Sequence, residues 1–194
     1  MSENDDHQEL TEQDEYFDTV DASDRVTGYA TRRETHARGL LHRATHIMLY
    51  DFNGNLFLQK RSMSKDTFPG CWDSSCSGHV DAGEDYLTAA RRELGEELGW
   101  FDTSQELRPV VKLNASAETG NEFIQVYLLG PITGNLNLNP REISEGRWVK
   151  PLELDVMLNQ QPEIMASALR LLWRNYREDI LARVWGSLGG PTRL

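Results

Sequence analysis

The sequence predicts a single α/β domain, and three observations support this prediction. The chain has 194 residues with 39% hydrophobic and 26% charged side chains, which is typical of one globular domain. Apolar segments of high β-propensity, separated by turn residues, recur between residues 16 and 149. Apolar residues recur at helical spacing over residues 86–98 and from residue 162 to about residue 185.

The first half of the chain is expected to form strands and tight turns. Tyr16–Val20 and Val26–Ala30 flank a turn that contains Asp and Ser, and we expect them to pair as a hairpin. An Asn-Gly pair at 53–54 predicts a second hairpin between strands over His42–Tyr50 and Leu56–Arg61. The remaining strands are expected over Ser74–His79, Val110–Ala115, Phe123–Leu129 and Gly146–Val149.

Helices are expected in three places. Residues 86–98 form a helix that ends at Gly99, a residue typical of the position after a helix. A short helix over residues 152–159 follows Pro151, and Pro162 stands at a favoured first-turn position of a long C-terminal helix, about 162–185. No apolar run reaches 18 residues, so we expect no membrane span.

The formal net charge of −11 is concentrated at the N-terminus. Residues 1–24 contain ten acidic residues and no Lys or Arg, so residues 25–194 carry a net charge of only −1. We therefore expect an acidic disordered tail over 1–14 and one folded domain over 15–194. The acidic balance argues against broad nucleic-acid binding. Two cysteines and no visible secretory signal predict a reduced, cytoplasmic protein.

Three carboxylates share one face of the helix expected over residues 86–98. At 100° per residue, Glu96 and Glu97 lie within about 60° of Glu93. Carboxylates crowded in this way repel one another, and a hard divalent cation such as Mg²⁺ is their natural neutraliser. The alternative is a charged, solvated helix face, which is the common reading of an isolated Glu-x-x-Glu-Glu pattern.

The pattern does not stand alone, because residues 78–100 match every position of the Nudix signature G-x5-E-x7-R-E-U-x-E-E-x-G-U, where U is bulky and apolar. The matching residues are Gly78, Glu84, Arg92, Glu93, Leu94, Glu96, Glu97, Gly99 and Trp100. The chain resembles the Nudix hydrolase family, which implies an α/β/α sandwich around a mixed sheet, here with an N-terminal hairpin and a C-terminal helix. The resemblance also implies Mg²⁺- or Mn²⁺-dependent hydrolysis of a nucleoside diphosphate linked to a further group, or of a related organic diphosphate.

The resemblance implies roles for individual residues. The metal ligands would be Glu93, Glu96, Glu97 and the carbonyl of Gly78. Glu93 is alternatively the catalytic base, Arg92 would orient the carboxylates, and Glu84 would brace the preceding loop. Glu142 and Glu145 lie in a segment that is similar to the one before the last strand of many family members, where a glutamate sometimes serves as a base or a metal ligand. Glu145 is the candidate here, and the alternative is an exposed loop residue.

A second pattern resembles type I isopentenyl diphosphate isomerase and its hydrolase relatives. It comprises Arg32-Arg33-Glu34-Thr35-His36, Gly39, His42-Arg43, Gln59-Lys60-Arg61-Ser62, Lys65, Thr67-Phe68-Pro69-Gly70, Trp72 and Gly78-His79. The resemblance implies that Arg61 and Lys65 hold the diphosphate. It also implies a second metal site, whose ligands would be His36, His42, His79 and Glu122.

Two departures favour a hydrolase over an isomerase. Ser77 stands where the isomerases have a catalytic cysteine, with Cys76 one residue earlier, and Gly120 replaces one of two glutamate ligands. The carboxylate helix, by contrast, is intact here and degraded in the isomerases. Isomerase-like activity and a non-catalytic diphosphate-binding module are the alternatives. The partner is a small-molecule diphosphate of unspecified structure, and the family resemblance makes a homodimer plausible.

Overall fold

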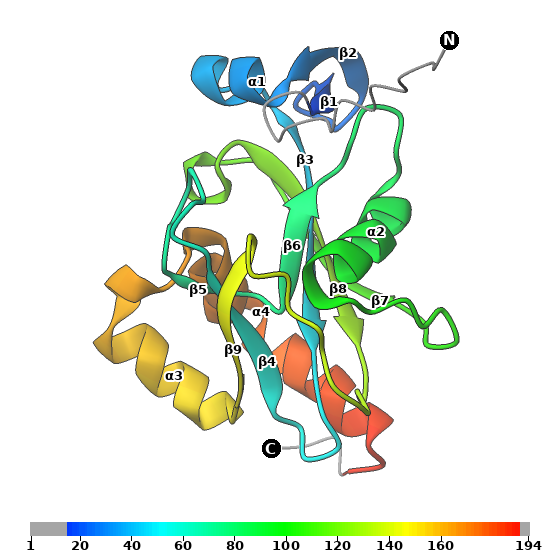
Figure 1. The fold of residues 1–194 in the computed structure, drawn as a ribbon, viewed down its shortest axis with the longest axis vertical. Helices are drawn as coiled ribbons and strands as arrows, with labels where there is room; N and C mark the ends of the chain where they lie inside the picture. The colour runs from blue at the N-terminus through cyan, green and yellow to red at the C-terminus, as the bar shows by residue number, and fades with distance from the viewer. Residues whose placement is uncertain (1–14, 191–194) are drawn as a thin grey trace, which may run out of the picture.

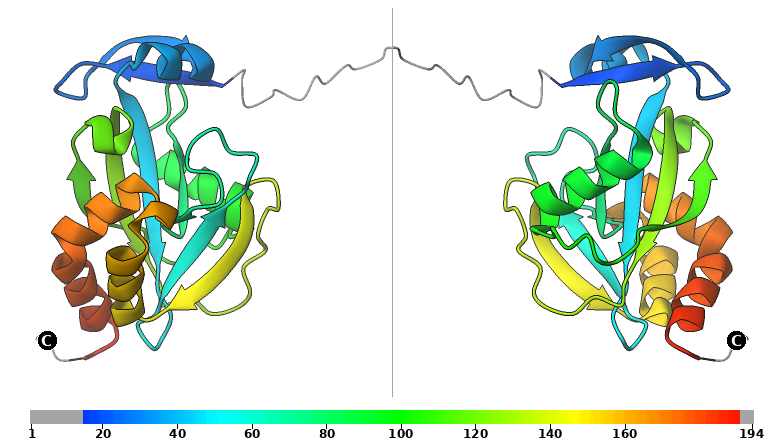
Figure 2. Two further views of the ribbon diagram at one scale, coloured as in Figure 1. Left: turned by 90° about the vertical axis from the view of Figure 1, so that its left-hand side faces the viewer. Right: turned by 90° about the vertical axis from the view of Figure 1, so that its right-hand side faces the viewer.

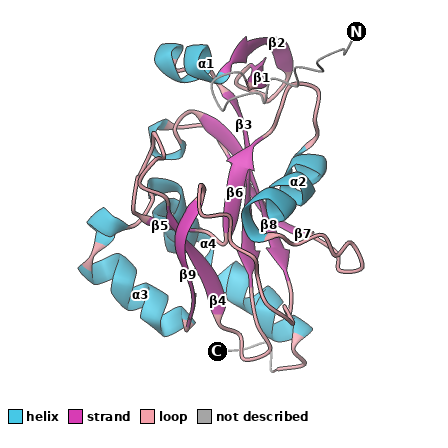
Figure 3. Ribbon diagram, in the orientation of Figure 1, coloured by secondary structure: helices cyan, strands magenta, loops and turns pink. Residues whose placement is uncertain are grey.

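A computed structural model describes residues 15–190 as strands grouped into three sheets, with helices on either side (Figure 1). The tail expected over residues 1–14 lies outside the described residues. In the described part, the alternation of strands and helices confirms the expected α/β class. Figure 3 shows most strands in the middle of the molecule and the N-terminal hairpin at the top, next to a short helix.

The N-terminal hairpin pairs β1 (Tyr16–Val20) with β2 (Val26–Thr31), as expected. It continues directly into α1 (Arg32–Arg38), a helix that the sequence patterns did not predict. The Thr31 hydroxyl caps α1 by accepting the backbone N–H of Glu34 at 3.2 Å. Gly39 ends it in the left-handed conformation, with φ of 60°. The helix has only seven residues, too few for a periodic apolar pattern.

The central sheet has four strands in the order β6-β3-β8-β7. Their bounds are His42–Leu49 for β3, Cys76–His79 for β6, Arg108–Leu113 for β7 and Glu122–Leu129 for β8. β3 and β8 run parallel and place His42 opposite Glu122, whereas the other two pairings are antiparallel. The sheet is therefore mixed, as expected.

A smaller sheet has the order β5-β4-β9, with bounds Trp72–Asp73 for β5, Leu56–Arg61 for β4 and Ile143–Val149 for β9. The Asn-Gly turn joins β3 to β4, and Gly54 there has φ of 73°. The hairpin expected at this turn was wrong, because β3 and β4 belong to different sheets and only Tyr50 and Leu56 form a bridge. β9 starts earlier than the expected Gly146 because residues from Ile143 onward already pair with β4. The pairing of β4 with β9 shifts in register between Lys60 and Arg61 of β4, so the ladder is irregular next to the loop that follows β4.

Helices cover both faces of the central sheet (Figure 2). α2 (Tyr86–Leu98) packs Ala90, Leu94 and Leu98 into one apolar cluster. α4 (Ser167–Ser187) buries Leu169, Leu172 and Ile180 in a second cluster, which α3 (Pro151–Gln160) joins through Leu154. No helix in residues 15–190 combines the length and the apolar character needed to cross a bilayer.

The C-terminal helix begins later than the expected Pro162. Pro162–Ile164 form a single 3₁₀ turn, and Met165 is extended, with φ of −117° and ψ of 130°. The backbone N–H of Ala166 donates to the carbonyl of Trp72 at 2.9 Å. This contact with β5 holds the chain out of the helix until Ser167.

Candidate active site

A cleft of about 640 Å³ lies where the two larger sheets meet. Its lining comes from α2, from β3 and β6 of the central sheet, from the segment after β4, from the segment before β9 and from the start of α4. Segments far apart in the sequence are thus brought to one place, and most of the expected site residues are among them.

The carboxylate helix is held in place at both ends. Asp85 caps the start of α2 by accepting the backbone N–H of Thr88 at 2.8 Å. Gly99 ends the helix with φ of 62°. Between these caps the apolar stripe faces the core, and the three carboxylates, Glu93, Glu96 and Glu97, line the cleft. The helical spacing seen in the sequence therefore does bring them together.

Glu93 packs against the backbone of β6 at Gly78. A Cβ atom at residue 78 would lie 2.0 Å from the Glu93 Cδ atom, so only glycine leaves room for this carboxyl group. Arg92 donates from Nη1 to Glu93 Oε1 at 2.7 Å. Burial, followed by the charge of Glu97, raises the pKa of Glu93 well above its ordinary value.

Glu97 is the most deeply buried of the three carboxylates, with 3% of its surface exposed. One of its oxygens accepts the backbone N–H of Ser77 at 3.1 Å and the side-chain amide of Gln59 at 3.2 Å. Burial raises its pKa to about 7, although hydrogen bonds from the Cys76 thiol and the Ser77 N–H favour the ionised form. Two strands, β4 and β6, therefore fix the orientation of this carboxylate.

Arg92 links the carboxylates to the loop that precedes α2. Its guanidinium group donates to both oxygens of Glu84, at 3.1 and 3.0 Å, and to the carbonyl of His79 at 2.9 Å. It also reaches Glu96 at 3.1 Å. These ion pairs raise the pKa of Arg92 despite its partial burial. The contacts are those expected of Arg92 and Glu84, whose catalytic roles stay predictions.

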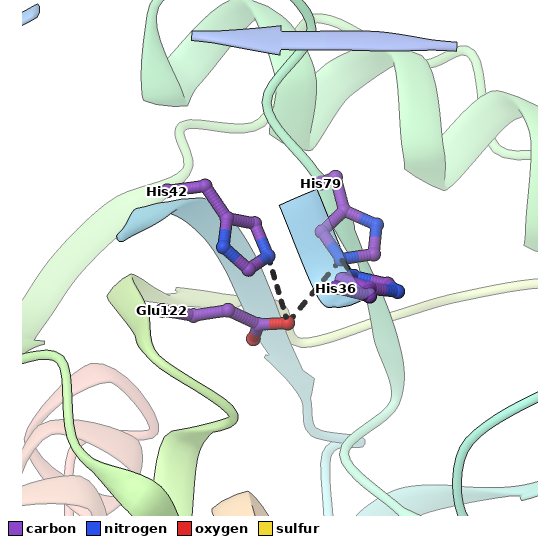
Figure 4. A group of neighbouring side chains, drawn as sticks. All are labelled: His36, His42, His79 and Glu122. Atoms are coloured by element: carbon purple, nitrogen blue, oxygen red, sulfur yellow. Dashed lines mark hydrogen bonds and ion pairs between the residues drawn. The ribbon is translucent and has the colours of Figure 1, made fainter. Parts of the chain in front are cut away.

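A second cluster joins three histidines and a glutamate from four different elements (Figure 4). Its members are His36 of α1, His42 of β3, His79 of β6 and Glu122 of β8. His79 Nε2 lies 3.2 Å from Glu122 Oε1 and 3.3 Å from His36 Nε2. His42 Nε2 lies 3.6 Å from the same Glu122 oxygen. One donor atom from each residue falls within 4.8 Å of all the others.

The pKa shifts of His36, His79 and Glu122 favour the protonation states that metal binding requires. Burial lowers the pKa of His79 to about 4 and also lowers the pKa of His36, so both rings are neutral at pH 7. Burial alone would raise the pKa of Glu122, but its interactions with the neighbouring His42 and His79 outweigh burial and lower that pKa. The buried Phe17 ring stacks on His79 with centroids 4.3 Å apart and shields the cluster from the hairpin side.

The geometry of this cluster fits a transition-metal ion. His42 Nε2 is buried, and Glu122 Oε1 at 3.6 Å is too far away for a normal hydrogen bond, which is a costly state for a polar atom unless something else binds it. Ligand atoms on a tetrahedral ion with bonds of about 2.0 Å lie roughly 3.3 Å apart, close to the three separations given above. Three imidazoles and one carboxylate are a donor set typical of zinc and similar ions.

Arg61 and Lys65, the expected diphosphate contacts, both line the cleft. Arg61 donates from Nε to the carbonyl of Thr67 at 3.0 Å and from Nη1 to Asp73 at 3.4 Å. Lys65 contacts the carboxylate of Glu142. Both cations therefore face the cleft while engaged with acceptors of the protein.

Glu145 does not join the other expected site residues. It is largely exposed, pairs with Lys60 at 3.7 Å and is not part of the cleft lining. Glu142, from the same segment, lines the cleft instead. The irregular register between β4 and β9 separates the two side chains. The sequence pattern contains both glutamates and did not indicate which of them faces the cleft.

The two residues before Gly78 have opposite environments, as their alternation on a strand predicts. Ser77 lines the cleft, whereas Cys76 is fully buried in the apolar cluster beneath α2. Burial raises the pKa of the Cys76 thiol well above its usual value. His46, which the sequence patterns did not single out as functional, lies opposite Ser77 and also lines the cleft.

Comparison with known proteins gives consistent results. Residues 40–172 match the model of the NUDIX domain. An uncharacterized Nudix hydrolase of Pseudomonas aeruginosa is 39% identical over 132 residues, which cover 68% of this chain and 76% of that protein. An isopentenyl-diphosphate delta-isomerase of Photorhabdus laumondii is 36% identical over 155 residues, with 78% and 86% covered. A crystal structure of a Deinococcus radiodurans protein superposes with a TM-score of 0.74 at 32% identity, covering 82% of this chain and 98% of that one.

Proposed function

The chain belongs to the Nudix family of pyrophosphohydrolases, and we propose that it cleaves the diphosphate linkage of a small organic substrate with the help of Mg²⁺ or Mn²⁺. The proposed ligands of the metal are Glu93, Glu96, Glu97 and the carbonyl of Gly78. The observation that carries this proposal is the group of three carboxylates that line the cleft, of which Glu97 is buried and only 12% of the Glu93 side chain is exposed.

The raised pKa values of Glu93 and Glu97 support a cation in this place. Two buried carboxyl groups side by side favour the protonated form, unless a positive charge compensates for their repulsion. Arg92 supplies one such charge but is shared with Glu84 and Glu96. A hard divalent ion with oxygen ligands would complete the neutralisation.

The protein's own groups would position the substrate and the attacking water. Arg61 and Lys65 face the cleft, where they would bind the diphosphate oxygens, and Gln59 with the Ser77 N–H would hold the Glu97 carboxylate in a fixed orientation. Glu93 is placed to accept a proton if it acts as the base. A bound divalent ion would polarise the diphosphate and lower the pKa of the attacking water.

Several observations support hydrolysis over isomerisation, although relatives with both names are about equally similar. Cys76 is fully buried and does not line the cleft, and its thiol is engaged in a hydrogen bond with Glu97, so it is poorly placed for proton transfer to an alkene. Gly120 has φ of 68°, a conformation that a glutamate side chain would strain. The intact carboxylate set supports metal-assisted hydrolysis. Isomerase-like activity and simple diphosphate binding are the alternatives.

We further propose that His36, His42, His79 and Glu122 hold a second metal ion. His79 and Glu122 also line the cleft, which places this cluster beside the substrate region. Its donor set differs from the all-oxygen set on α2, so the two sites would select different ions. The cytoplasmic location and the homodimer suggested by the sequence stay predictions.

The decisive experiment measures phosphate release from a panel of nucleoside and isoprenoid diphosphates, with Mg²⁺ and Mn²⁺ titrated separately. Glu97→Gln should abolish turnover while the melting temperature and the circular dichroism stay close to those of the parent. Glu145→Gln, which changes a carboxylate outside the cleft, is the matched control and should be fully active. Unchanged turnover in Glu97→Gln would refute the mechanism. Formation of an allylic isomer, or binding without turnover, would favour one of the two alternatives.

A further inference from the structure

Lys65 and Glu142 form an ion pair inside the cleft, and the proposed mechanism so far assigns Glu142 no part. Only 11% of the Lys65 side chain and 21% of the Glu142 side chain are exposed. Both residues line the cleft, and both influence the pKa of Glu97, which Glu142 raises and Lys65 lowers. The pair therefore lies close to the carboxylates of α2.

The segment that carries Glu142 is tied to its surroundings by backbone hydrogen bonds. Asn139 donates its backbone N–H to the carbonyl of Glu97 at 2.8 Å, and Glu142 donates to the carbonyl of Asn139 at 3.0 Å. On the other side, the N–H of Ser62 donates to the carbonyl of Glu142 at 2.8 Å. These bonds fix the backbone of Glu142 relative to α2 and to the segment that bears Lys65. The carboxylate can thus leave Lys65 by side-chain rotation alone.

We propose that the Glu142 carboxylate competes with phosphate for the ammonium group of Lys65. The substrate must displace this carboxylate in order to bind Lys65, and the ion pair between Lys65 and Glu142 forms again after cleavage. This inference rests on the proposed function, in which Lys65 binds the diphosphate. It makes Glu142 a residue that sets anion selectivity, distinct from the metal ligands on α2.

Charge decides which anions can displace the carboxylate. A diphosphate that arrives with its divalent ion offers Lys65 several charged oxygens and is held at the same time by the carboxylate site. Inorganic phosphate or a monophosphate product has fewer contacts and competes poorly with a carboxylate that is already in place. The pair therefore weakens the binding of single phosphates more than it weakens the binding of substrate. This difference favours product release.

Arg61 shows why Lys65 is the selective group. Arg61 keeps its contacts with Thr67 and Asp73 and has five donors, so it can bind a phosphate without losing its present partners. The lysine ammonium is a compact point charge with three donors. A phosphate and Glu142 would therefore compete directly for the same cation.

The test compares the parent, Glu142→Gln and Glu145→Gln. For each, the KM of the best diphosphate substrate and the Ki of inorganic phosphate are measured at saturating Mg²⁺. Glu142→Gln should lower KM by roughly threefold and the Ki of phosphate by about tenfold, since a charged partner has been removed from Lys65. Glu145→Gln should change neither value. In a Lys65→Met background, Glu142→Gln should have no further effect on either.

Calorimetric titration of inorganic phosphate into the Mg²⁺-loaded proteins gives a readout that needs no turnover. Tighter phosphate binding by Glu142→Gln than by the parent would support competition between Glu142 and phosphate, even if no substrate of the panel were cleaved. The binding result and the turnover result can therefore fail independently of each other. Phosphate binding that is unchanged or weaker in Glu142→Gln would overturn the inference. An equal gain in the Lys65→Met background would also overturn it. Glu142→Ala provides a second variant should Glu142→Gln fold poorly.

Discussion

Replacing Gly78 with alanine tests the packing of Glu93 against β6. The added Cβ would lie 2.0 Å from Cδ and from Oε1 of Glu93, and 2.4 Å from Oε2. Ordinary contacts of a Cβ atom begin near 3.4 Å, so the carboxyl group must withdraw by more than 1 Å. The change adds one methyl group to the protein and removes no functional group.

The size of the expected effect follows from this displacement. A methyl group forced into a filled space costs about 1–3 kcal/mol of stability, and the far end of a flexible side chain yields more cheaply than backbone. A catalytic group misplaced by about 1 Å can lose about 100-fold in rate. We therefore expect Gly78→Ala to lower kcat by about two orders of magnitude while lowering the free energy of unfolding by no more than about 2 kcal/mol.

Steady-state turnover and urea unfolding measure the two effects on the same preparations. Gly186→Ala is the matched control, because a Cβ there meets no atom within 4 Å and should leave activity unchanged. Glu93→Asp shortens the crowded side chain, so combining it with Gly78→Ala should cost less than the sum of the single changes. Full activity of Gly78→Ala, or strictly additive losses, would refute the argument that Gly78 exists to seat Glu93.

Three further predictions concern the metals and the hairpin. Because the pKa of Glu97 is about 7, a proton competes with Mg²⁺ below neutrality, and calorimetry should show about tenfold weaker binding at pH 6 than at pH 8; equal affinities would contradict this. His42→Ala should weaken Co²⁺ binding, followed by its visible absorbance, by more than about tenfold, whereas His46→Ala should not. Burial alone would raise the pKa of Asp24, but hydrogen bonds from Lys112, Arg43 and Tyr86 have the larger combined effect, and the pKa is lowered. Asp24→Asn should therefore cost about 1–3 kcal/mol in urea unfolding at pH 7. The difference should shrink as the pH falls through the lowered pKa below about 4; a cost that stays constant down to pH 2 would refute the role of this carboxylate.

Local patterns predicted the carboxylate helix and its orientation well. Caps at both ends and a regular apolar stripe define α2, so the shared face of Glu93, Glu96 and Glu97 followed from helical geometry alone. Strand alternation likewise separated Cys76 from Ser77. Features of this kind depend only on residues a few positions apart, and they can therefore be predicted from the sequence.

Features that depend on distant pairing could not be predicted in the same way. The histidine cluster needs the parallel register that places His42 opposite Glu122, across about 80 residues of chain. Its resemblance to the isomerases suggested the residues, but no local pattern indicated their proximity. The start of α4 depends on a hydrogen bond to Trp72. That Glu142 and not Glu145 lines the cleft depends on the irregular register between β4 and β9. Each of these is a property of tertiary contacts.

The stacking of Phe17 on His79 affects how a metal ion could reach the cluster of His36, His42, His79 and Glu122. The strand β1 covers the histidines on the hairpin side. A hydrogen bond from Arg43 to Asp24, in the turn that follows β1, holds the hairpin in this position. His79 and Glu122 remain open to the cleft. An ion bound at this cluster would therefore lie next to any molecule in the cleft, so the occupancy of the two places would be coupled.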